Sequence, residues 1–382
     1  MKKLFLSICL LASVALCASE PGDDVLRAYN RAGGGYVIMD ASGDVVGFST
    51  EGEINAANVD DLFFLGSPIE ITNAPADMEQ VAGFPAPVKD SVGPLLGDIA
   101  FNQGKPYYNM TPTIGGNHCA TGCVATAMAM IASYWQWPKT CNDAVVSYTP
   151  GKVGEKLTYT YTGHSFDWAN MKPQYTGIIA EEGEYPESEA QQNAVADLML
   201  ACGVGVYMNY GTDGSGSTST NVPKVFREYF NYKNTLELQR VEDLNTRGTL
   251  FTDLIGEFDA GRPVYCDGYL QKDGQDDAFH AYVMDGYVTL QGDDNLTLPY
   301  FHFNFGWGGQ NNGWYCIKGN RDRSIYSSLN VILYLEPNAP AGIEETRESL
   351  KDGKIRDIMG REVRETVAGQ LYILNGEKFI AR

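Results

Sequence analysis

Positively charged residues and histidines are scarce in this chain of 382 residues. Lysine and arginine together number 28 against 48 aspartates and glutamates, which gives a formal net charge of −20. So acidic a chain repels phosphates, and no basic stripe is visible, so we expect it to bind neither nucleic acid nor an anionic lipid surface. The motifs GxSxG, HExxH and the phosphate loop are absent. The histidines are not spaced as metal ligands, so we expect no metal site and no cofactor; they are His118, His164, His280 and His302.

Long hydrophobic runs are missing as well. Two lysines near the N-terminus lead into the apolar residues 4–16, a run too short to span a membrane, and small residues follow. This pattern is typical of a signal peptide, which we place at residues 1–19. Cys17 suggests a lipoprotein as the alternative, but the bulky Leu16 before it argues for ordinary signal cleavage. No later stretch is long and apolar enough for a transmembrane helix, so we expect export without stable membrane insertion.

One cysteine stands out by its surroundings. In TGCVATAMAMIASYWQW, Cys123 follows a glycine and opens a run with helical periodicity, which predicts an amphipathic helix. A thiol at a helix N-terminus faces unpaired N–H groups and the positive end of the helix dipole, which favour the nucleophilic thiolate. The alternative is a buried structural cysteine. The apolar positions are Val124, Ala127, Met128, Ile131 and Trp135, and Pro138 ends the run.

A base and an orienting amide follow further along the chain. His280 in DAFHAYVMDGY precedes an apolar run, as at the start of a buried strand, and YFHFNFGWGGQNNGWY contains Asn304, Phe305 and Trp307. An amide oxygen that accepts from one imidazole nitrogen fixes the tautomer and leaves the other nitrogen to face sulfur. Cysteine, histidine and asparagine in this order are typical of papain-like enzymes.

The segments TGCVATAMA, FHAYVMDGY and FHFNFGWGG resemble the nucleophile, base and asparagine–tryptophan segments of the streptopain-like cysteine peptidases, a branch of the papain superfamily. Further matching stretches extend the resemblance over residues 92–335. It implies an α+β papain-like fold, with Cys123 in a helical half and His280 and Asn304 in an antiparallel β half, and it implies a cysteine endopeptidase acting on proteins. It also implies that the amide of Gln103 forms the oxyanion hole with the Cys123 N–H, where the developing charge needs donors.

Two other features of the expected site follow. Relatives often carry tryptophan where this chain has Phe305, whereas Trp307 matches a second family tryptophan; both rings should screen His280 and Asn304 from water. Catalysis is therefore assigned to Cys123, His280, Asn304, Gln103 and Trp307. The residues expected to bind substrate are Ser215, Gly216, Ser217, Phe279 and Phe305.

The region after the signal carries six cysteines. Cys119 lies four residues before Cys123 and is its rival as nucleophile, but it lacks the glycine-then-helix context. If Cys123 is the nucleophile, five cysteines remain, so at most two pairs and one free thiol can form. The other four are Cys141, Cys202, Cys266 and Cys316.

The N-terminal segment, residues 20–91, differs in character from the rest. GGGYVIMDASGDVVGFSTEGEI predicts two short strands at 36–39 and 45–49, joined by a turn. The resemblance implies an inhibitory pro-domain followed by a proline-rich linker, with the peptidase domain at residues 92–336. We expect maturation by a cut between Phe84 and Pro94. The alternative is an ordinary small β-domain.

Residues 337–382 form a linker and a tail of alternating apolar residues, in which Asn375-Gly376 predicts a hairpin turn. The DIMGREV…GQLYILNGEKFIAR pattern resembles C-terminal sorting tails read by type IX secretion machinery. This implies a protein that is secreted, or held on the outer surface, by a Gram-negative-type bacterium. The alternative is a hairpin that caps the catalytic domain.

Two other functions remain open from the sequence. The chain could be a silent relative that binds or inhibits proteins, although intact Cys123, His280, Asn304 and Gln103 argue against it. It could also be an amidase or transferase that uses the same thioester chemistry on non-protein amides, because a fold does not fix its substrate.

Overall fold

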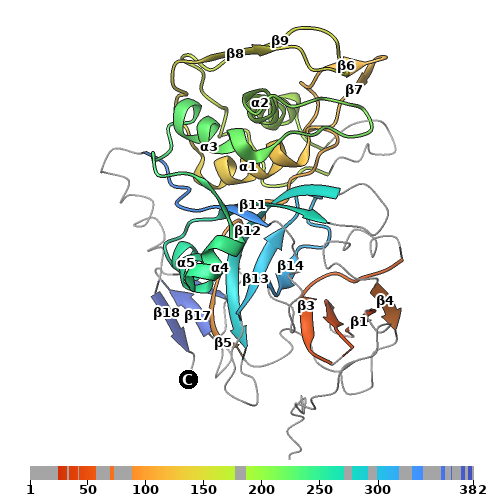
Figure 1. Ribbon diagram of the computed structural model, residues 1–382, viewed down its shortest axis with the longest axis vertical. Helices are drawn as coiled ribbons and strands as arrows, with labels where there is room; N and C mark the ends of the chain where they lie inside the picture. Colours follow the sequence, from red (N-terminus) through yellow and green to blue (C-terminus); the bar gives the residue numbers. More distant parts are fainter. Residues whose placement is uncertain are drawn as a thin grey trace, which may run out of the picture. The chain divides into compact units, whose positions relative to one another are not determined.

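The chain divides into two compact units in the computed structural model (Figure 1). Unit 1 comprises Met1–Ser91, Tyr287–Phe301 and Gly313–Tyr326, and unit 2 comprises Val92–Gly286, His302–Asn312 and Ser327–Arg382. The residues that the structure describes are 25–31, 34–41, 43–56, 69–72, 88–176, 186–270, 278–290, 299–317, 329–338, 354–357, 363, 371–374 and 377–380. The predicted signal peptide and most of the predicted linkers lie outside them.

Helix α1 (Cys123–Trp135) is the central helix of unit 2 and packs against α2 (Glu189–Gly205). Its first ten residues are all buried, and it ends in the left-handed Gln136, two residues before Pro138, as the apolar spacing predicted. Helix α2 begins with a capping box in which Ser188 and Gln191 satisfy each other's backbone N–H groups.

Shorter helices complete this unit. Three short turns of different kinds follow one another: a 3₁₀ turn (η2, Ser219–Asn221), one α-turn (α3, Val222–Lys224) and a π-helical turn (η3, Val225–Tyr229). Helices α4 (Val241–Arg247) and α5 (Leu250–Asp259) follow. Two small hairpins, β6 (Thr113–Ile114) with β7 (Asn117–His118) and β8 (Val145–Tyr148) with β9 (Leu157–Thr160), lie on the helical side in Figure 1.

The sheet of unit 2 is built from strands in the order β10, β15, β11, β12 and β13. Their bounds are Leu238–Arg240, Asn330–Ile332, Val264–Leu270, Ala278–Leu290 and Pro299–Asn304. Strands β11 and β12 are antiparallel, with Gly268 opposite His280 and Asp267 opposite Ala281. Helices α1 to α3 gather on one side of β11 and β12 (Figure 1), which gives the helical half and the antiparallel half that the sequence predicted.

Unit 1 joins the N-terminal segment to strands from much later in the chain. Strands β2 (Tyr36–Met39) and β3 (Val45–Ser49) have the predicted bounds, and β1 (Leu26–Asn30) and β4 (Ile69–Thr72) continue their sheet in the order β3, β2, β1, β4. Strand β5 (Val88–Val92) pairs with β12 instead. Strand β14 (Gly313–Tyr315) pairs antiparallel with β3, Trp314 opposite Phe48 and Tyr315 opposite Gly47.

Side chains fix this pairing in place. A Cβ atom on Gly47 would lie 2.5 Å from the Tyr315 ring, so the close approach requires glycine. The Tyr36 and Tyr315 hydroxyls are 2.8 Å apart, and Phe48 and Trp314 share a small buried core. Strands of the N-terminal segment and a strand from beyond residue 312 thus form one sheet.

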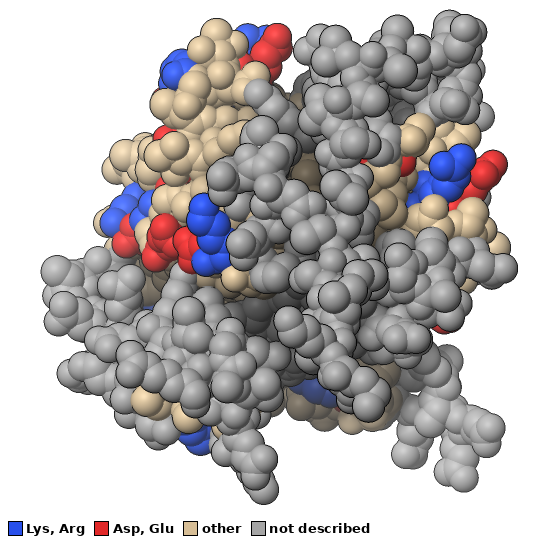
Figure 2. Space-filling view, turned by 90° about the horizontal axis from the view of Figure 1, so that it is seen from below, with Lys and Arg blue, Asp and Glu red and all other residues tan. Residues whose placement is uncertain are grey.

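The tail contains its own antiparallel sheet of β16 (Ile355–Asp357), β17 (Leu371–Leu374) and β18 (Glu377–Ile380). Leu374 pairs with Glu377, as the predicted hairpin requires, whereas the turn residues Asn375 and Gly376 lie outside the described residues. Within the described ranges, no helix is both long and apolar enough to cross a bilayer. On the face drawn in Figure 2, basic and acidic side chains of the described residues stand next to each other.

Candidate active site

Cys123 is the first residue of α1, and glycine immediately before it is a structural requirement. Gly122 has φ +86°, and a Cβ atom on it would lie 2.7 Å from Met208 Sδ. A side chain there would therefore suffer both backbone strain and a steric clash. Cys123 is 9% exposed, so its sulfur sits at the helix N-terminus with little access to water.

The start of α1 meets strand β12 beside His280. Ala281, the residue directly after His280, belongs to the same buried cluster as Cys123, and its backbone N–H lowers the pKa of the Cys123 thiol. A Cβ atom on Gly306, in the loop after β13, would lie 2.9 Å from Thr126 Cγ2 on α1. The structure therefore brings the predicted nucleophile, base and asparagine–tryptophan loop together within unit 2.

The His280 ring forms a hydrogen bond with the Phe305 carbonyl and stacks against the Trp307 indole. Its Nε2 lies 2.9 Å from Phe305 O, and because a carbonyl can only accept, Nε2 carries a proton. Trp307 stacks on the imidazole with ring centroids 4.6 Å apart and planes at 27°, and Phe305 stacks on Trp307 at 5.2 Å. Phe305 is 1% exposed, so the two aromatic rings shield one side of the imidazole.

Asn304 does not hold His280 in this structure, which corrects the predicted hydrogen bond. Its Nδ2 donates to Ile99 O (2.7 Å), and its Oδ1 accepts from the Gly306 N–H (3.2 Å). The amide is thus used to fasten the segment before Phe101 and the turn at Gly306, whose φ is +70°. The ring is oriented by the Phe305 carbonyl instead.

The segment that contains Gln103 is fastened on both sides of the site. The Thr121 N–H donates to Gln103 O (3.2 Å), and the Gly308 N–H donates to Phe101 O (2.8 Å). Asn102 Oδ1 accepts from the Gln103 N–H at 2.6 Å. Since Thr121 lies two residues before Cys123, these bonds place Gln103 beside the nucleophile.

Burial sets the protonation states of the pair. Burial lowers the pKa of His280 to about 4, although the hydrogen bond to the Phe305 carbonyl opposes the shift. Burial raises the pKa of Cys123, against the opposing effect of N–H groups that include Ala281's, and the Asp267 carboxylate raises it further. The raised pKa of the Cys123 thiol runs against the expectation of a thiolate, because desolvation outweighs the N–H groups at the start of α1.

The other predicted residues have structural partners. Ser215 Oγ donates to Ala120 O (2.6 Å) and Ser217 Oγ donates to Val206 O (2.5 Å), so the two hydroxyls tie this loop to the segment before Cys123 and to the end of α2. A Cβ atom on Gly122 would lie 3.1 Å from Ser215 O, so this loop borders the nucleophile. Gly216 pairs with Asn209 in an isolated bridge. Phe279 is half-buried against the core of unit 2.

The remaining cysteines are free and buried in the structure. Cys119 is 0% exposed, follows β7 rather than opening a helix, and has a pKa raised by burial. Its carbonyl accepts from Thr111 Oγ1 (2.6 Å), which gives it a structural setting. The four others are Cys141, Cys202, Cys266 and Cys316. Among the described residues, no group of three or more potential ligands could hold a metal ion.

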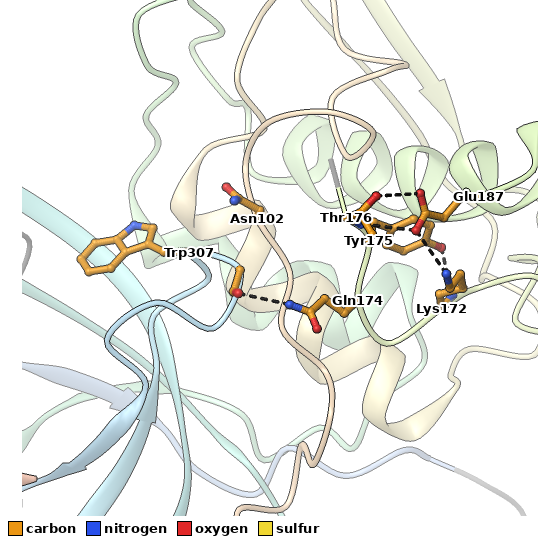
Figure 3. Close-up of a pocket in the computed structure, with 8 residues that line it drawn as sticks. Asn102, Lys172, Gln174, Tyr175, Thr176, Glu187 and Trp307 are labelled. Atoms are coloured by element: carbon orange, nitrogen blue, oxygen red, sulfur yellow. Dashed lines mark hydrogen bonds and ion pairs between the residues drawn. The ribbon is translucent and has the colours of Figure 1, made fainter. Parts of the chain in front are cut away.

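A polar pocket that was not predicted from the sequence lies beside Trp307. Its volume is about 310 Å³, and Figure 3 shows Asn102 and Trp307 at one end and Lys172 with Glu187 at the other. Lys172 and Glu187 form an ion pair, and no local sequence pattern predicts that these two residues lie close together.

A cysteine beside a histidine, between a helix and an antiparallel sheet, defines a papain-like cysteine peptidase. Residues 101–315 match the sequence model of the Peptidase C10 family, and the chain belongs to this family. It is 28% identical over 315 residues to streptopain from Streptococcus pyogenes, covering 76% of this chain and 73% of streptopain. It is 27% identical over 353 residues to the thiol protease/hemagglutinin PrtT of Porphyromonas gingivalis, covering 84% of this chain and 38% of PrtT.

Solved structures agree with the fold. A prointerpain A fragment from Prevotella intermedia superposes with a TM-score of 0.57 at 24% identity, covering 80% of this chain and 94% of the fragment. Active interpain A from the same organism gives 0.51 at 27% identity, covering 65% and 98%. The predicted family, the papain-like α+β fold and cysteine-type peptidase activity are confirmed. The type IX sorting tail stays a prediction.

Replacing Gly122 by alanine should lower the free energy of unfolding more than the same change at Gly116. The two glycines have similar φ values, +86° and +84°, but only Gly122 has a neighbour in the way. Both variants should lose about 1–2 kcal/mol of stability from backbone strain, and Gly122→Ala a further 1–3 kcal/mol, roughly, from the clash with Met208. Urea unfolding of both variants measures the difference. Equal losses would contradict the steric argument.

Alkylation of Cys123 in the full-length chain should be slow at pH 7 and should accelerate only above the pH typical of free cysteine. A raised thiol pKa keeps the unreactive thiol protonated to higher pH, and a neutral His280 supplies no compensating charge. Iodoacetamide labelling from pH 5 to 10, with peptide mapping by mass spectrometry, isolates Cys123 from the other cysteines. Fast, pH-independent labelling of Cys123 near pH 6 would show a preformed thiolate.

Proposed function

We propose that the protein is an exported cysteine endopeptidase, made as a latent precursor, in which Cys123 is the nucleophile and His280 the general acid–base. The observation that carries this proposal is that Cys123 shares a buried cluster with Ala281, the residue directly after His280, whose N–H lowers the pKa of the Cys123 thiol. These residues lie inside the region that matches the Peptidase C10 family. Protein is the proposed substrate, and the chemistry needs no metal or cofactor.

In the proposed reaction, the thiol proton passes to His280 while the Cys123 sulfur attacks a peptide carbonyl carbon. The oxyanion of the tetrahedral intermediate accepts from the Cys123 N–H and the Gln103 amide. His280 then gives its proton to the departing amine, and the C–N bond breaks to leave a thioester. Water, deprotonated by His280, attacks the thioester, and the sulfur leaves with the proton. Trp307 and Phe305 keep the ring dry and oriented.

Latency is supported by the neutral state of the pair and by the pairing of β3 with β14. Burial opposes a charge on both the thiol and the imidazole, so proton transfer from Cys123 to His280 is disfavoured in this form. We assign the strands at 26–72 to the pro-domain, and maturation to a cut between Phe84 and Pro94. The chain downstream is already anchored, because the Leu96 N–H donates to Asp285 Oδ2 at 3.0 Å.

Export by a signal peptide at residues 1–19, and sorting by the tail through type IX secretion machinery, complete the proposal. The protein would then be secreted or carried on the outer surface of a Gram-negative-type cell. The separate three-stranded sheet of the tail supports an independent recognition module.

Replacing Cys123 by alanine should abolish both casein hydrolysis and self-maturation, by more than about a thousandfold, because no other group supplies the thiolate. Gel analysis of purified protein under reducing conditions, with and without a thiol blocker, measures both reactions. N-terminal sequencing of the mature form should find its first residue between positions 85 and 94.

The matched control is Cys119→Ala, which should retain the chemistry. Undiminished proteolysis in Cys123→Ala would overturn the assignment of the nucleophile. Thiol labelling without casein hydrolysis would favour a thiol amidase or transferase instead.

Fusing residues 337–382 to an inert exported reporter should carry the reporter across the outer membrane of a cell with type IX machinery. The comparison is the same fusion lacking β17 and β18, which should stay in the periplasm. Cell fractionation measures both. Equal periplasmic retention of the two fusions would count against a sorting role for the tail.

A further inference from the structure

The polar pocket beside Trp307 lies in unit 2 and borders the groups proposed for catalysis. Trp307 stacks on His280, and Asn102 directly precedes Gln103. Gln174 Nε2 donates to Gly308 O (3.3 Å), which ties the floor of the pocket to the Trp307 loop (Figure 3). The pocket is therefore continuous with the site.

The position of Trp307 identifies which part of a substrate the pocket would receive. In peptide hydrolysis His280 gives its proton to the departing amine, so the chain after the scissile bond lies on the side of the base. Trp307 contacts the ring of that base and also lines the pocket. Residues on the leaving-group side of the cut would pass over this pocket.

Lys172 and Glu187 form an ion pair in the pocket, and the difference in their exposure determines which charge a substrate can reach. The two side chains are 3.1 Å apart, but that of Glu187 is 0% exposed whereas that of Lys172 is 37% exposed. Glu187 is further held by the Thr176 N–H and hydroxyl, both at 3.3 Å. A substrate can therefore reach the ammonium but not the carboxylate.

Glu187 is ionised and serves to hold the cation. Burial alone would raise the pKa of Glu187, but hydrogen bonds from Lys172 and the Thr176 N–H outweigh this and lower it. The Lys172 N–H donates to Tyr175 Oη (2.9 Å), and Gln192 Nε2 donates to Glu187 O (2.8 Å). Both members of the pair thus have fixed backbones, so Lys172 is presented with little conformational freedom left to lose.

We propose that this pocket is a leaving-group-side subsite that selects an acidic substrate side chain, with Lys172 as its specificity-determining residue. A lysine ammonium has three donors, so those not directed at Glu187 remain for a substrate carboxylate. The Asn102 side chain adds amide hydrogen-bonding capacity at the other end. This inference rests on the proposed peptidase function and assigns a substrate class to the same site.

Internally quenched peptides test the inference. The peptides are identical except for Glu, Gln or Lys placed in turn at each of the first three positions after the cut. The mature enzyme should prefer Glu over Lys by about five- to tenfold in kcat/KM at one of these positions, the size of a partly screened charged hydrogen bond. The preference should shrink as salt is added.

Lys172→Met should bring the Glu/Lys ratio close to one, and Lys172→Arg should keep it above one. Each ratio is normalised to the same variant's rate on an acyl-coumarin substrate, which has no residue after the cut. Because Lys172→Met leaves Glu187 buried and unpaired, the double variant Lys172→Met/Glu187→Gln serves where the single variant folds poorly. Lys156→Met, at an exposed lysine between β8 and β9, is the control and should change neither rate.

The outcomes separate this inference from the function on which it rests. A parent enzyme that cleaves the coumarin substrate but shows no preference for Glu at any of the three positions overturns the subsite alone. So does a preference that persists in both Lys172→Met and the double variant. A parent that cleaves neither the coumarin substrate nor any peptide overturns the proposed function as well.

Discussion

Cys123 and His280 lie where the start of α1 meets strand β12, and the withdrawal of both from water governs the chemistry of the site. The N–H groups at the helix start and the Ala281 N–H lower the pKa of the Cys123 thiol, but burial raises this pKa by more. The imidazole is subject to the same constraint, since the Phe305 carbonyl only partly offsets the effect of burial. The structure thus holds the two groups close together in a place where burial opposes a charge on either of them.

The sequence predicted those parts of the molecule that depend on local order. Glycine before Cys123, helical spacing after it and Pro138 beyond it sufficed to place α1, because each acts on its immediate neighbours. Two short apolar runs and the turn between them placed β2 and β3 for the same reason. The family motifs then brought the cysteine and histidine segments together, which no local rule could do.

Properties that depend on distant neighbours could not be predicted. The direction of the Cys123 pKa shift depends on the burial of its sulfur, and the use of the Asn304 amide depends on where Ile99 lies. The pairing of β3 with β14 joins residues more than 250 positions apart. The Lys172–Glu187 pair presents its positive member to solvent because Lys172 is exposed whereas Glu187 is buried. In each case the deciding quantity is a tertiary contact or a solvent exposure, which composition and periodicity do not encode.

The pairing of β3 with β14 has a consequence for the shortened protein. If the proposed maturation removes the N-terminal strands, the edge of β14 at Trp314 and Tyr315 that faces β3 is left without its neighbouring strand. An unprotected strand edge is a template for any extended polypeptide, whether an unfolded protein or another copy of the same molecule. The proposed cut would therefore expose a surface for self-association on the shortened chain.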